Sequence, residues 1–421
     1  MSLGSNIQYL YSSNLLDLLS KIGQIANKNS LKAYVVGGFV RDLLLNKPNY
    51  DIDIMVEGDA IPFATSVGQE LKAECKLIER FHTAHIYHEN LVIDFSSARK
   101  EYYPHPGALP EVTFSNIRDD LYRRDFTINA MALSIIPDQP FELIDLFNGK
   151  QDLDSKIIRI LHGRSFLDDP TRLYRALRFG DRFNFIMEPK TEMLFEKAIQ
   201  LSYPSSLSTK RIAAEIDKAF NEKRPLSLLT KYQNTGLLAY FHKSFSEWTR
   251  PDFKFSIVPA LTTRLRSKFK NISDSAVFWC FLLSNMPLEE AKPLLNSSGL
   301  LHTVTSQVID SLNSWQTLLS KLIIANNKIE IYNALKNSCP ESIALLYLKN
   351  KNKDVEKKLN LYTNELASIK PLITGDDLIE AGIKPGPEIR KIFDRIIEKR
   401  IEGFSLTRKE ELDLATAISN I

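Results

Sequence analysis

The spacing of hydrophobic residues changes part-way along the chain. In the first 160 residues, short apolar runs bounded by Gly, Asn or Pro occur at 33–36, 52–56 and 91–95. Runs of this length between turn residues predict buried β-strands. From about residue 168 onward, apolar residues recur every three or four positions, which predicts successive amphipathic helices. We therefore expect a mixed α/β first part and an all-helical second part.

Length and charge limit the classes of protein to consider. A chain of 421 residues exceeds the roughly 250–300 residues that one core usually fills, so several domains are expected. The 54 Lys and Arg residues nearly balance the 51 Asp and Glu residues, giving a net charge of +3. Charge alone therefore does not indicate a nucleic-acid partner. The longest apolar run, Ala276–Leu283, is far short of the ~20 residues that span a bilayer, so no membrane association is expected.

The cysteines and the first residues bear on location. Cys75, Cys280 and Cys339 are far apart and form no CxxC pair, which argues against a disulfide framework and a thiolate zinc site. The first residues lack the basic and apolar segments of a signal peptide. These features predict a cytoplasmic protein, and nothing indicates an obligate protein partner.

Two glycines lie between an expected strand and an expected helix. Gly37 and Gly38 follow the run 33–36, and a short amphipathic helix is predicted from about Phe39. Backbone N–H groups and the positive end of the helix then meet at one point, which suits a phosphate group. Arg41 lies in the first turn, within reach of the same phosphate. No GK[ST] or GxGxxG follows, which excludes a Walker loop and a dinucleotide fingerprint.

Carboxylates follow on the next expected strand. Asp51 and Asp53 are two residues apart, so their side chains share a face. Two carboxylates on one face repel each other unless a cation lies between them, which favours Mg²⁺. Asp94, between Ile93 and Phe95, offers a third oxygen ligand, and three carboxylates suit a two-metal phosphoryl-transfer site. An ion pair between Asp94 and an arginine remains an equal alternative.

In combination, these residues resemble a known signature. The run Gly37-Gly38-x-Val-Arg41-Asp followed by Asp51-x-Asp53 is similar to that of class II tRNA nucleotidyltransferases and bacterial poly(A) polymerases. A second run matches the motif that contacts the ribose and triphosphate of the incoming nucleotide in that family, at Arg123, Arg124, Asp125 and Asn129. Adjacent guanidinium groups supply forked donors for phosphate, and a carboxylate can accept from a ribose hydroxyl.

A third run resembles the protein-template motif of the family. In that motif an acidic residue and an arginine bind the edge of the nucleobase, which points to Asp169 and Arg172 here. Arg175 and Arg178 continue the three-residue spacing as a basic stripe on one helix. The alternative for Asp169 is a helix N-cap followed by Pro170 at the first helical position.

The resemblance implies an α+β fold and four domains. A polymerase-β-like nucleotidyltransferase head on a mixed sheet would occupy residues 1–160. All-helical domains would follow: a neck with the base-reading motif at 161–225, a body at 226–340, and a tRNA-binding tail at 341–421.

The implied activity is template-independent addition of CCA, or of the terminal A, to the 3′ end of tRNA. The substrates would be CTP and ATP, pyrophosphate would leave, and two Mg²⁺ ions would be held on Asp51 and Asp53. The partner would be the acceptor arm of tRNA. It would be bound by basic residues that include Arg264, Arg266, Lys391 and Arg395. A solvated helix face is the alternative for each of these basic clusters.

Two segments bear on which activity of the family to expect. Residues 99–111 hold three prolines and one glycine, which fits the flexible loop that A addition needs, although a plain connector is also possible. The run Arg80–His85 lacks the Gly-Arg-Arg-Phe pattern of poly(A) polymerases. His82, His85 and His88 would divide between both faces of a strand, which argues against zinc. CC-only addition, poly(A) synthesis and a non-catalytic RNA-binding scaffold remain alternatives.

Overall fold

The computed structural model describes residues 7, 9–11, 13–79, 82–247 and 257–419. Its contacts divide the chain into two compact units. The first comprises residues 1–215 and 222–246, and the second comprises 216–221 and 247–421. Arg80 and Phe81, the first two residues of the run that was compared with the poly(A) polymerase pattern, lie outside the described residues. The finer division into head, neck, body and tail stays a prediction.

A seven-stranded sheet forms the centre of the first unit. Its order is β3-β4-β5-β2-β1-β8-β9. The strands β2 and β5 are parallel and the other neighbours are antiparallel, so the predicted mixed sheet is confirmed. The strands are β1 (Lys32–Val36), β2 (Ile52–Glu57), β3 (Glu74–Ile78), β4 (Thr83–His88), β5 (Leu91–Ser97), β8 (Ala132–Ser134) and β9 (Leu143–Ile144).

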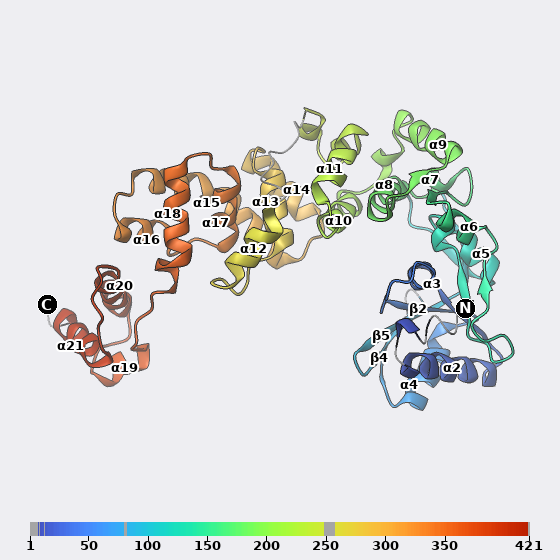
Figure 1. Ribbon diagram of the computed structural model, residues 1–421, viewed down its shortest axis with the longest axis horizontal. Coiled ribbons are helices and arrows are strands. Elements are labelled where there is room, and N and C mark those ends of the chain that lie inside the picture. Colours follow the sequence, from blue (N-terminus) through green and yellow to red (C-terminus); the bar gives the residue numbers. More distant parts are fainter. Residues whose placement is uncertain (1–6, 8, 12, 80–81, 248–256, 420–421) are drawn as a thin grey trace. The chain divides into compact units, whose positions relative to one another are not determined.

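Burial along β5 shows which face of the sheet carries the carboxylates. Ile93 and Phe95 are fully or almost fully buried, and the ring of Phe95 meets Phe63 of α4 (Ala60–Leu71) at 5.6 Å between centroids. Because successive side chains of a strand alternate, Asp94 points away from α4. Figure 1 shows α2 (Ser13–Lys28) and α4 beside these strands. The face under α4 is thus buried, and Asp94 lies on the opposite face, part of which is also buried around Met55.

Two short β-pairs differ from the sequence-based expectations. Part of the predicted flexible loop forms an antiparallel ribbon of β6 (Arg99–Tyr102) and β7 (Glu111–Phe114). In the part expected to be all-helical, β11 (Ile186–Met187) pairs with β10 (Ile157–Ile158). The ribbon of β6 and β7 was not predicted, because the Pro and Gly residues of the segment outweighed the β-forming residues at its ends. The pair of β10 and β11 was not predicted, because a two-residue strand is too short to show a period.

Helices make up the rest of the first unit. The predicted helix after the two glycines is α3 (Gly38–Leu44), and the predicted base-reading helix is α8 (Thr171–Phe183). The other helices are α5 (Ile117–Tyr122), α6 (Gly149–Asp154), α7 (Ser165–Asp168), α9 (Pro189–Gln200), α10 (Thr209–Phe220), which continues into the second unit, and α11 (Pro225–Asn234), with 3₁₀ turns η2 (Thr127–Asn129), η3 (Tyr203–Ser206), η4 (Leu237–Tyr240) and η5 (Lys243–Glu247).

The second unit is helical, as predicted. Its last three helices enclose a small apolar core in which Ile392 and Ile396 of α20 (Pro387–Ile401) are fully buried. The others are α12 (Val258–Arg266), α13 (Asp274–Leu283), α14 (Leu288–Ser297), α15 (His302–Ile324), α16 (Lys328–Leu335), α17 (Pro340–Lys349), α18 (Lys353–Asn364), α19 (Gly375–Glu380) and α21 (Arg408–Ser419), with the 3₁₀ turn η7 (Leu366–Ser368).

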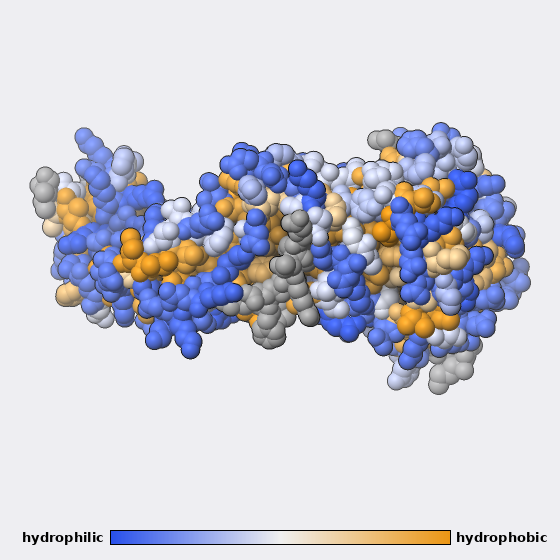
Figure 2. Space-filling view, turned by 90° about the horizontal axis from the view of Figure 1, so that it is seen from above, coloured by the Kyte–Doolittle hydropathy of each residue, from blue (hydrophilic) through white to orange (hydrophobic). Residues whose placement is uncertain are grey.

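No helix within the described residues combines the length and the apolar character that a bilayer crossing requires. Figure 2 shows hydrophilic residues over most of the visible face, with hydrophobic residues gathered in separate patches.

Candidate active site

The glycine turn lies against the carboxylates of the sheet. Gly37 has φ of 73° and ψ of −125°, a conformation that favours glycine. A side chain there would begin 2.7 Å from Nη1 of Arg124 and 4.0 Å from Oδ2 of Asp53. No side chain caps the helix α3 that starts at Gly38. The structure therefore brings the turn, one arginine and one carboxylate to the same place, with the backbone N–H groups of the helix start beside them.

Three aspartates lie near one another at this point of the sheet. Asp53 on β2 lies directly opposite Asp94 on β5 in the parallel register, and Asp51 immediately precedes β2. Burial, and then repulsion from Asp51, raises the pKa of Asp53 to about 6, against the attraction of Arg124; Asp94 and Asp120 raise it further. The negative charges thus exceed what the nearby arginine balances.

This excess of carboxylate fits a divalent cation. A cation beside Asp53 would relieve the repulsion that raises its pKa, and carboxylate oxygens are the ligands that Mg²⁺ prefers. Within the described part of the chain, however, no three His, Cys, Asp or Glu side chains converge as a metal-holding group. The predicted set of three carboxylates is therefore not preformed. Water and nucleotide phosphates commonly complete the Mg²⁺ coordination at sites with one or two carboxylates.

The raised pKa of Asp53 predicts a pH-dependent gain in stability for Asp53→Asn in the metal-free chain. A carboxyl group whose pKa is about 6 in the folded state and 3.8 when unperturbed destabilises the folded state when it is ionised, by up to about 3 kcal/mol above pH 6. We expect Asp53→Asn to raise the thermal midpoint in EDTA at about pH 8. This gain over the wild type should shrink as the pH falls from about 6 to 4, and an equal gain at about pH 8 and pH 4 would contradict the prediction.

Arg123 and Arg124 share one buried acid that sequence reasoning missed. Oδ1 of Asp120 accepts from Nε and Nη2 of Arg123 at 3.0 and 2.6 Å, and Oδ2 accepts from Nη2 of Arg124 at 3.0 Å. Burial favours a higher pKa for Asp120, but the two arginines hold it below the usual value. Nη1 of Arg123 also donates to Glu101 at 2.9 Å. Arg124 lies beside Gly37, whereas Arg123 is held between two acids.

Asp125 connects helix α8 to the segment between α5 and η2. Its Oδ1 accepts from Nδ2 of Asn129 at 3.0 Å, and its Oδ2 accepts from Nε of Arg175 at 2.8 Å. Burial would raise the pKa of Asp125, but Arg175 and the hydrogen bonds lower it to about 2. Both oxygens are thus occupied within the protein. The predicted ribose contact of Asp125 would require one of these partners to be exchanged.

Arg41 is also engaged within the protein. Its Nε and Nη2 donate to Asp42 at 2.9 and 2.8 Å, and its Nη1 donates to Asn129 at 2.6 Å. The guanidinium lies 4.8 Å from the ring centroid of Phe183, and only 5% of the residue is exposed. The local spacing predicted a phosphate donor at this position. The structure places Arg41 beside Gly38 but already holds three of its five N–H groups, so its phosphate contact stays a prediction.

Asp169 makes the capping contact that the sequence offered as an alternative to base reading, and its contact with a nucleobase stays a prediction. Its Oδ1 accepts from the backbone N–H of Thr171 at 3.0 Å, as a cap of α8 does, and from Nη2 of Arg211 at 2.6 Å. Arg172 follows on the first turn of the same helix. Its Nη2 donates to the backbone oxygen of Arg123 at 2.6 Å, so the predicted base-reading pair lies next to the predicted triphosphate arginines.

Comparisons with known proteins agree with this geometry. Residues 33–159 match the family described as Poly A polymerase head domain, and residues 270–414 match that described as tRNA nucleotidyltransferase domain 2. An A-adding tRNA nucleotidyltransferase of Halalkalibacterium halodurans is 31% identical over 420 residues, covering 98% of this chain and 95% of the relative. The chain belongs to the tRNA nucleotidyltransferase family.

Other members of the family are similar to the same extent. The A-adding tRNA nucleotidyltransferase of Geobacter sulfurreducens is 32% identical over 412 residues, covering 96% of this chain but 47% of the relative. The chain thus spans about half the length of that protein. The solved structure of a CCA-adding enzyme with ATP matches with a TM-score of 0.75 and 29% identity, covering 99% of this chain and 98% of the other. The predicted fold is confirmed.

Arg178 pairs with acids of the helical part, although it shares the ring of Phe179 with Arg175. Its Nη2 donates to Glu215 at 3.1 Å, its Nη1 lies 3.6 Å from Glu222, and its side chain is 5% exposed. The three-residue spacing correctly predicted a shared helix but could not show where the acid partners lie. In this member of the family, Arg178 is part of an ion-pair cluster within the helical part, and its nucleotide contact stays a prediction.

The predicted RNA-binding residues lie in the second unit. The guanidinium of Arg264 lies 4.6 Å from the ring centroid of Tyr347, and Nη2 of Arg266 donates to Asp274 at 2.7 Å. On α20, Lys391 is exposed and Arg395 pairs with Glu398 at 2.9 Å. The contacts of these four residues with tRNA stay predictions.

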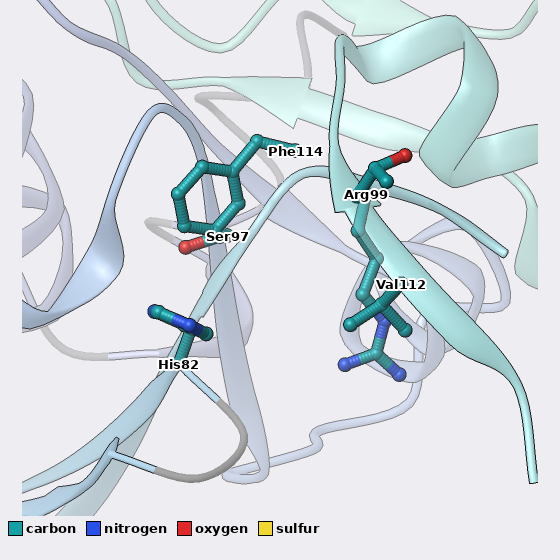
Figure 3. Close-up of a pocket in the computed structure, with 6 residues that line it drawn as sticks. His82, Ser97, Arg99, Val112 and Phe114 are labelled. Atoms are coloured by element: carbon teal, nitrogen blue, oxygen red, sulfur yellow. The ribbon is translucent and has the colours of Figure 1, made fainter.

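A cavity of about 210 Å³ lies between the β6–β7 ribbon and the sheet. His82 and Phe114 line one side of it and Arg99 and Val112 the other, as Figure 3 shows. The rings of His82 and Phe114 meet edge to face at 5.0 Å. None of the predicted nucleotide-binding residues lines this cavity, so it is separate from the site of the three aspartates.

Proposed function

We propose that the chain adds the terminal A to tRNA ending in CC, using ATP and releasing pyrophosphate. The observation that carries the proposal is the position of Asp53 beside the glycine turn and Arg124, with Asp51 and Asp94 near it. The two relatives reported above, of Halalkalibacterium halodurans and Geobacter sulfurreducens, support A addition, since both are named A-adding. Complete CCA addition is the second candidate, because the similar solved structure is of a CCA-adding enzyme. A cytoplasmic location fits either activity.

The residues of the site divide the work by charge. Asp51 and Asp53 would hold Mg²⁺, which when bound lowers the pKa of the attacking hydroxyl and balances charge on the phosphates. Arg124 and the backbone N–H groups at Gly37 and Gly38 would bind the triphosphate and orient its α-phosphate for attack by the 3′-hydroxyl of the RNA. Positioning of this kind provides most of the catalysis in phosphoryl transfer.

Base selection would fall to Asp169 and Arg172. A carboxylate acceptor and a guanidinium donor match the exocyclic amine and the ring acceptor that adenine and cytosine share. Uracil and guanine lack that pattern at the same edge. The hydrogen bonds of Arg172 to Ser165 and of Asp169 to Arg211, both at 2.6 Å, hold the pair in place for this task.

Three tRNA transcripts test the proposal. They end before the CC sequence, after CC, or after CCA, and each is incubated with CTP, ATP or both in Mg²⁺. We expect incorporation of A on the CC-ended transcript and none of C on any of them. Addition of C and then A to the shortest transcript would indicate a CCA-adding enzyme, and addition of C alone would indicate a CC-adding one. Long tails of A would indicate a poly(A) polymerase.

A transcript set without any incorporation would favour the non-catalytic scaffold. A scaffold would still bind tRNA, so a binding measurement under the same conditions separates it from an inactive preparation. The buried and repelling carboxylate of Asp53 argues for catalysis, because a raised pKa of this kind at a site without function would only reduce stability.

A further inference from the structure

One histidine stands beside the carboxylates without a role in the proposed function. The register places His85 of β4 directly opposite Asp94 of β5, and Asp94 directly opposite Asp53 of β2. Paired residues on neighbouring strands point to the same face of a sheet. His85, Asp94 and Asp53 therefore form one row across three adjacent strands, on the face away from α4.

His85 binds its neighbour in this row. Its Nδ1 lies 2.5 Å from Oδ1 of Asp94, and the two side chains are 30% and 40% exposed. Of the residues that the structure describes, no other side chain forms a hydrogen bond with the Asp94 carboxylate. The terminal torsion of an aspartate is broad, so a carboxylate without this partner would take several orientations. The contact with His85 selects one of them.

The electrostatics of the row agree with this arrangement. Asp94 is close enough to Asp53 to be among the causes that raise its pKa. The hydrogen bond with His85 engages Oδ1 of Asp94, and no side chain that the structure describes forms a hydrogen bond with its Oδ2, which leaves that oxygen available for a cation. His85 is on the far side of Asp94 from Asp53, because β5 lies between β4 and β2.

We propose that His85 is a positioning residue that holds Asp94 toward the cation expected at Asp51 and Asp53. The inference rests on the metal dependence of the proposed function. It requires a hydrogen on Nδ1 of His85, so that this N–H donates a hydrogen bond to Oδ1 of Asp94. Partners of this kind typically change metal affinity or activity by about 10-fold to 100-fold when they are removed.

Binding of Mn²⁺ to the full chain, followed by electron paramagnetic resonance, tests the role of His85 without turnover. We expect His85→Ala to weaken Mn²⁺ binding by about 10-fold to 100-fold. His85→Asn should restore most of the affinity, because its amide nitrogen occupies nearly the position of Nδ1. His85→Gln should not, because its amide nitrogen corresponds to Nε2. The matched control is His88→Ala, since His88 is on the same strand but points to the other face.

Several outcomes would overturn the inference. These are equal Mn²⁺ affinity of the wild type and His85→Ala, an Asn variant as weak as the Ala variant, or a wild-type chain that binds no Mn²⁺. In an Asp94→Asn background, His85→Ala should have no further effect, since the two act through one contact. A wild type that binds Mn²⁺ but incorporates no nucleotide would contradict the proposed function alone, and the Mn²⁺ affinities would still decide the role of His85.

Discussion

Replacement of Asp53 by asparagine is expected to reduce nucleotide incorporation by about a thousandfold while tRNA binding is retained. Asparagine keeps the size of the side chain but removes the charge that would hold the cation. Metal-ion stabilisation of phosphoryl transfer contributes several kcal/mol, and about 4 kcal/mol corresponds to a thousandfold change in rate. Asp51→Asn should have an effect of similar size. The measurement is the rate of A addition to a CC-ended transcript in Mg²⁺, with RNA binding determined in parallel.

Asp138→Asn is the matched control for these variants. Asp138 is an exposed residue of the same unit, so this change removes the same charge away from the carboxylate row. Its rate should equal that of the wild type. A rate for Asp53→Asn within a few-fold of the wild-type rate would show that this carboxylate does not hold a required metal. Loss of RNA binding together with activity would indicate a folding defect instead.

The second large effect is expected at the ion pair of buried Asp125 with the partly exposed Arg175. Arg175→Met keeps most of the apolar stem but leaves the Asp125 carboxylate, which is 7% exposed, without its charged partner. Breaking a buried ion pair by removing one member costs about 3–5 kcal/mol. The pKa of Asp125, now about 2, should rise because burial then dominates. We expect a lower midpoint of urea denaturation at neutral pH.

A second substitution separates the ion pair from general packing. In the Arg175→Met background, Asp125→Asn removes the uncompensated charge and should recover part of the lost stability, because a neutral amide is less costly to bury. Additive losses in the double variant would contradict the account. The same pair joins α8 to the segment after Arg124, so activity should fall in Arg175→Met even below its denaturation midpoint.

The local features of the site could be predicted from the sequence. Gly37, Asp51 and Asp53 lie within one strand-turn-helix-strand segment, so a short stretch of sequence specifies their proximity. The expected strands and the helix after the glycines are all present in the structure. Asp94 was expected beside them, and the parallel pairing of β2 and β5 places it there. Its expected alternative partner, an arginine, is replaced by His85.

Contacts between distant segments could not be predicted in this way. Arg41 and Arg178 have the spacing of ligand-binding residues, but each is engaged by partners that lie far along the chain, such as Asn129 and Glu215. The sequence does not show whether the N–H groups of an arginine beside a motif are available to a ligand or already donate to other residues of the protein. The buried acid Asp120 is a different case, because it lies three and four residues before the arginines that it holds, and this helical spacing could have indicated the two ion pairs.

The pairing of His85 with Asp94 did have a signal in the sequence. Strands β4 and β5 are separated by Glu89 and Asn90, and Glu89 has the positive φ of 52° that tight hairpin turns require. A two-residue turn at this position fixes the register and places His85 opposite Asp94. Recognising the hairpin would therefore have predicted the contact, whereas the spacing of the three histidines alone suggested only a strand with both faces occupied.

The most direct test of the central claim is the extension of a CC-ended tRNA transcript by the wild-type chain, with ATP as the sole nucleotide. Mass spectrometry of the RNA and an assay of released pyrophosphate follow the reaction with Mg²⁺ and with EDTA. The account predicts one added AMP residue and one pyrophosphate per transcript in Mg²⁺, and neither in EDTA. An unchanged transcript in Mg²⁺, under conditions in which the chain binds both tRNA and ATP, would contradict it.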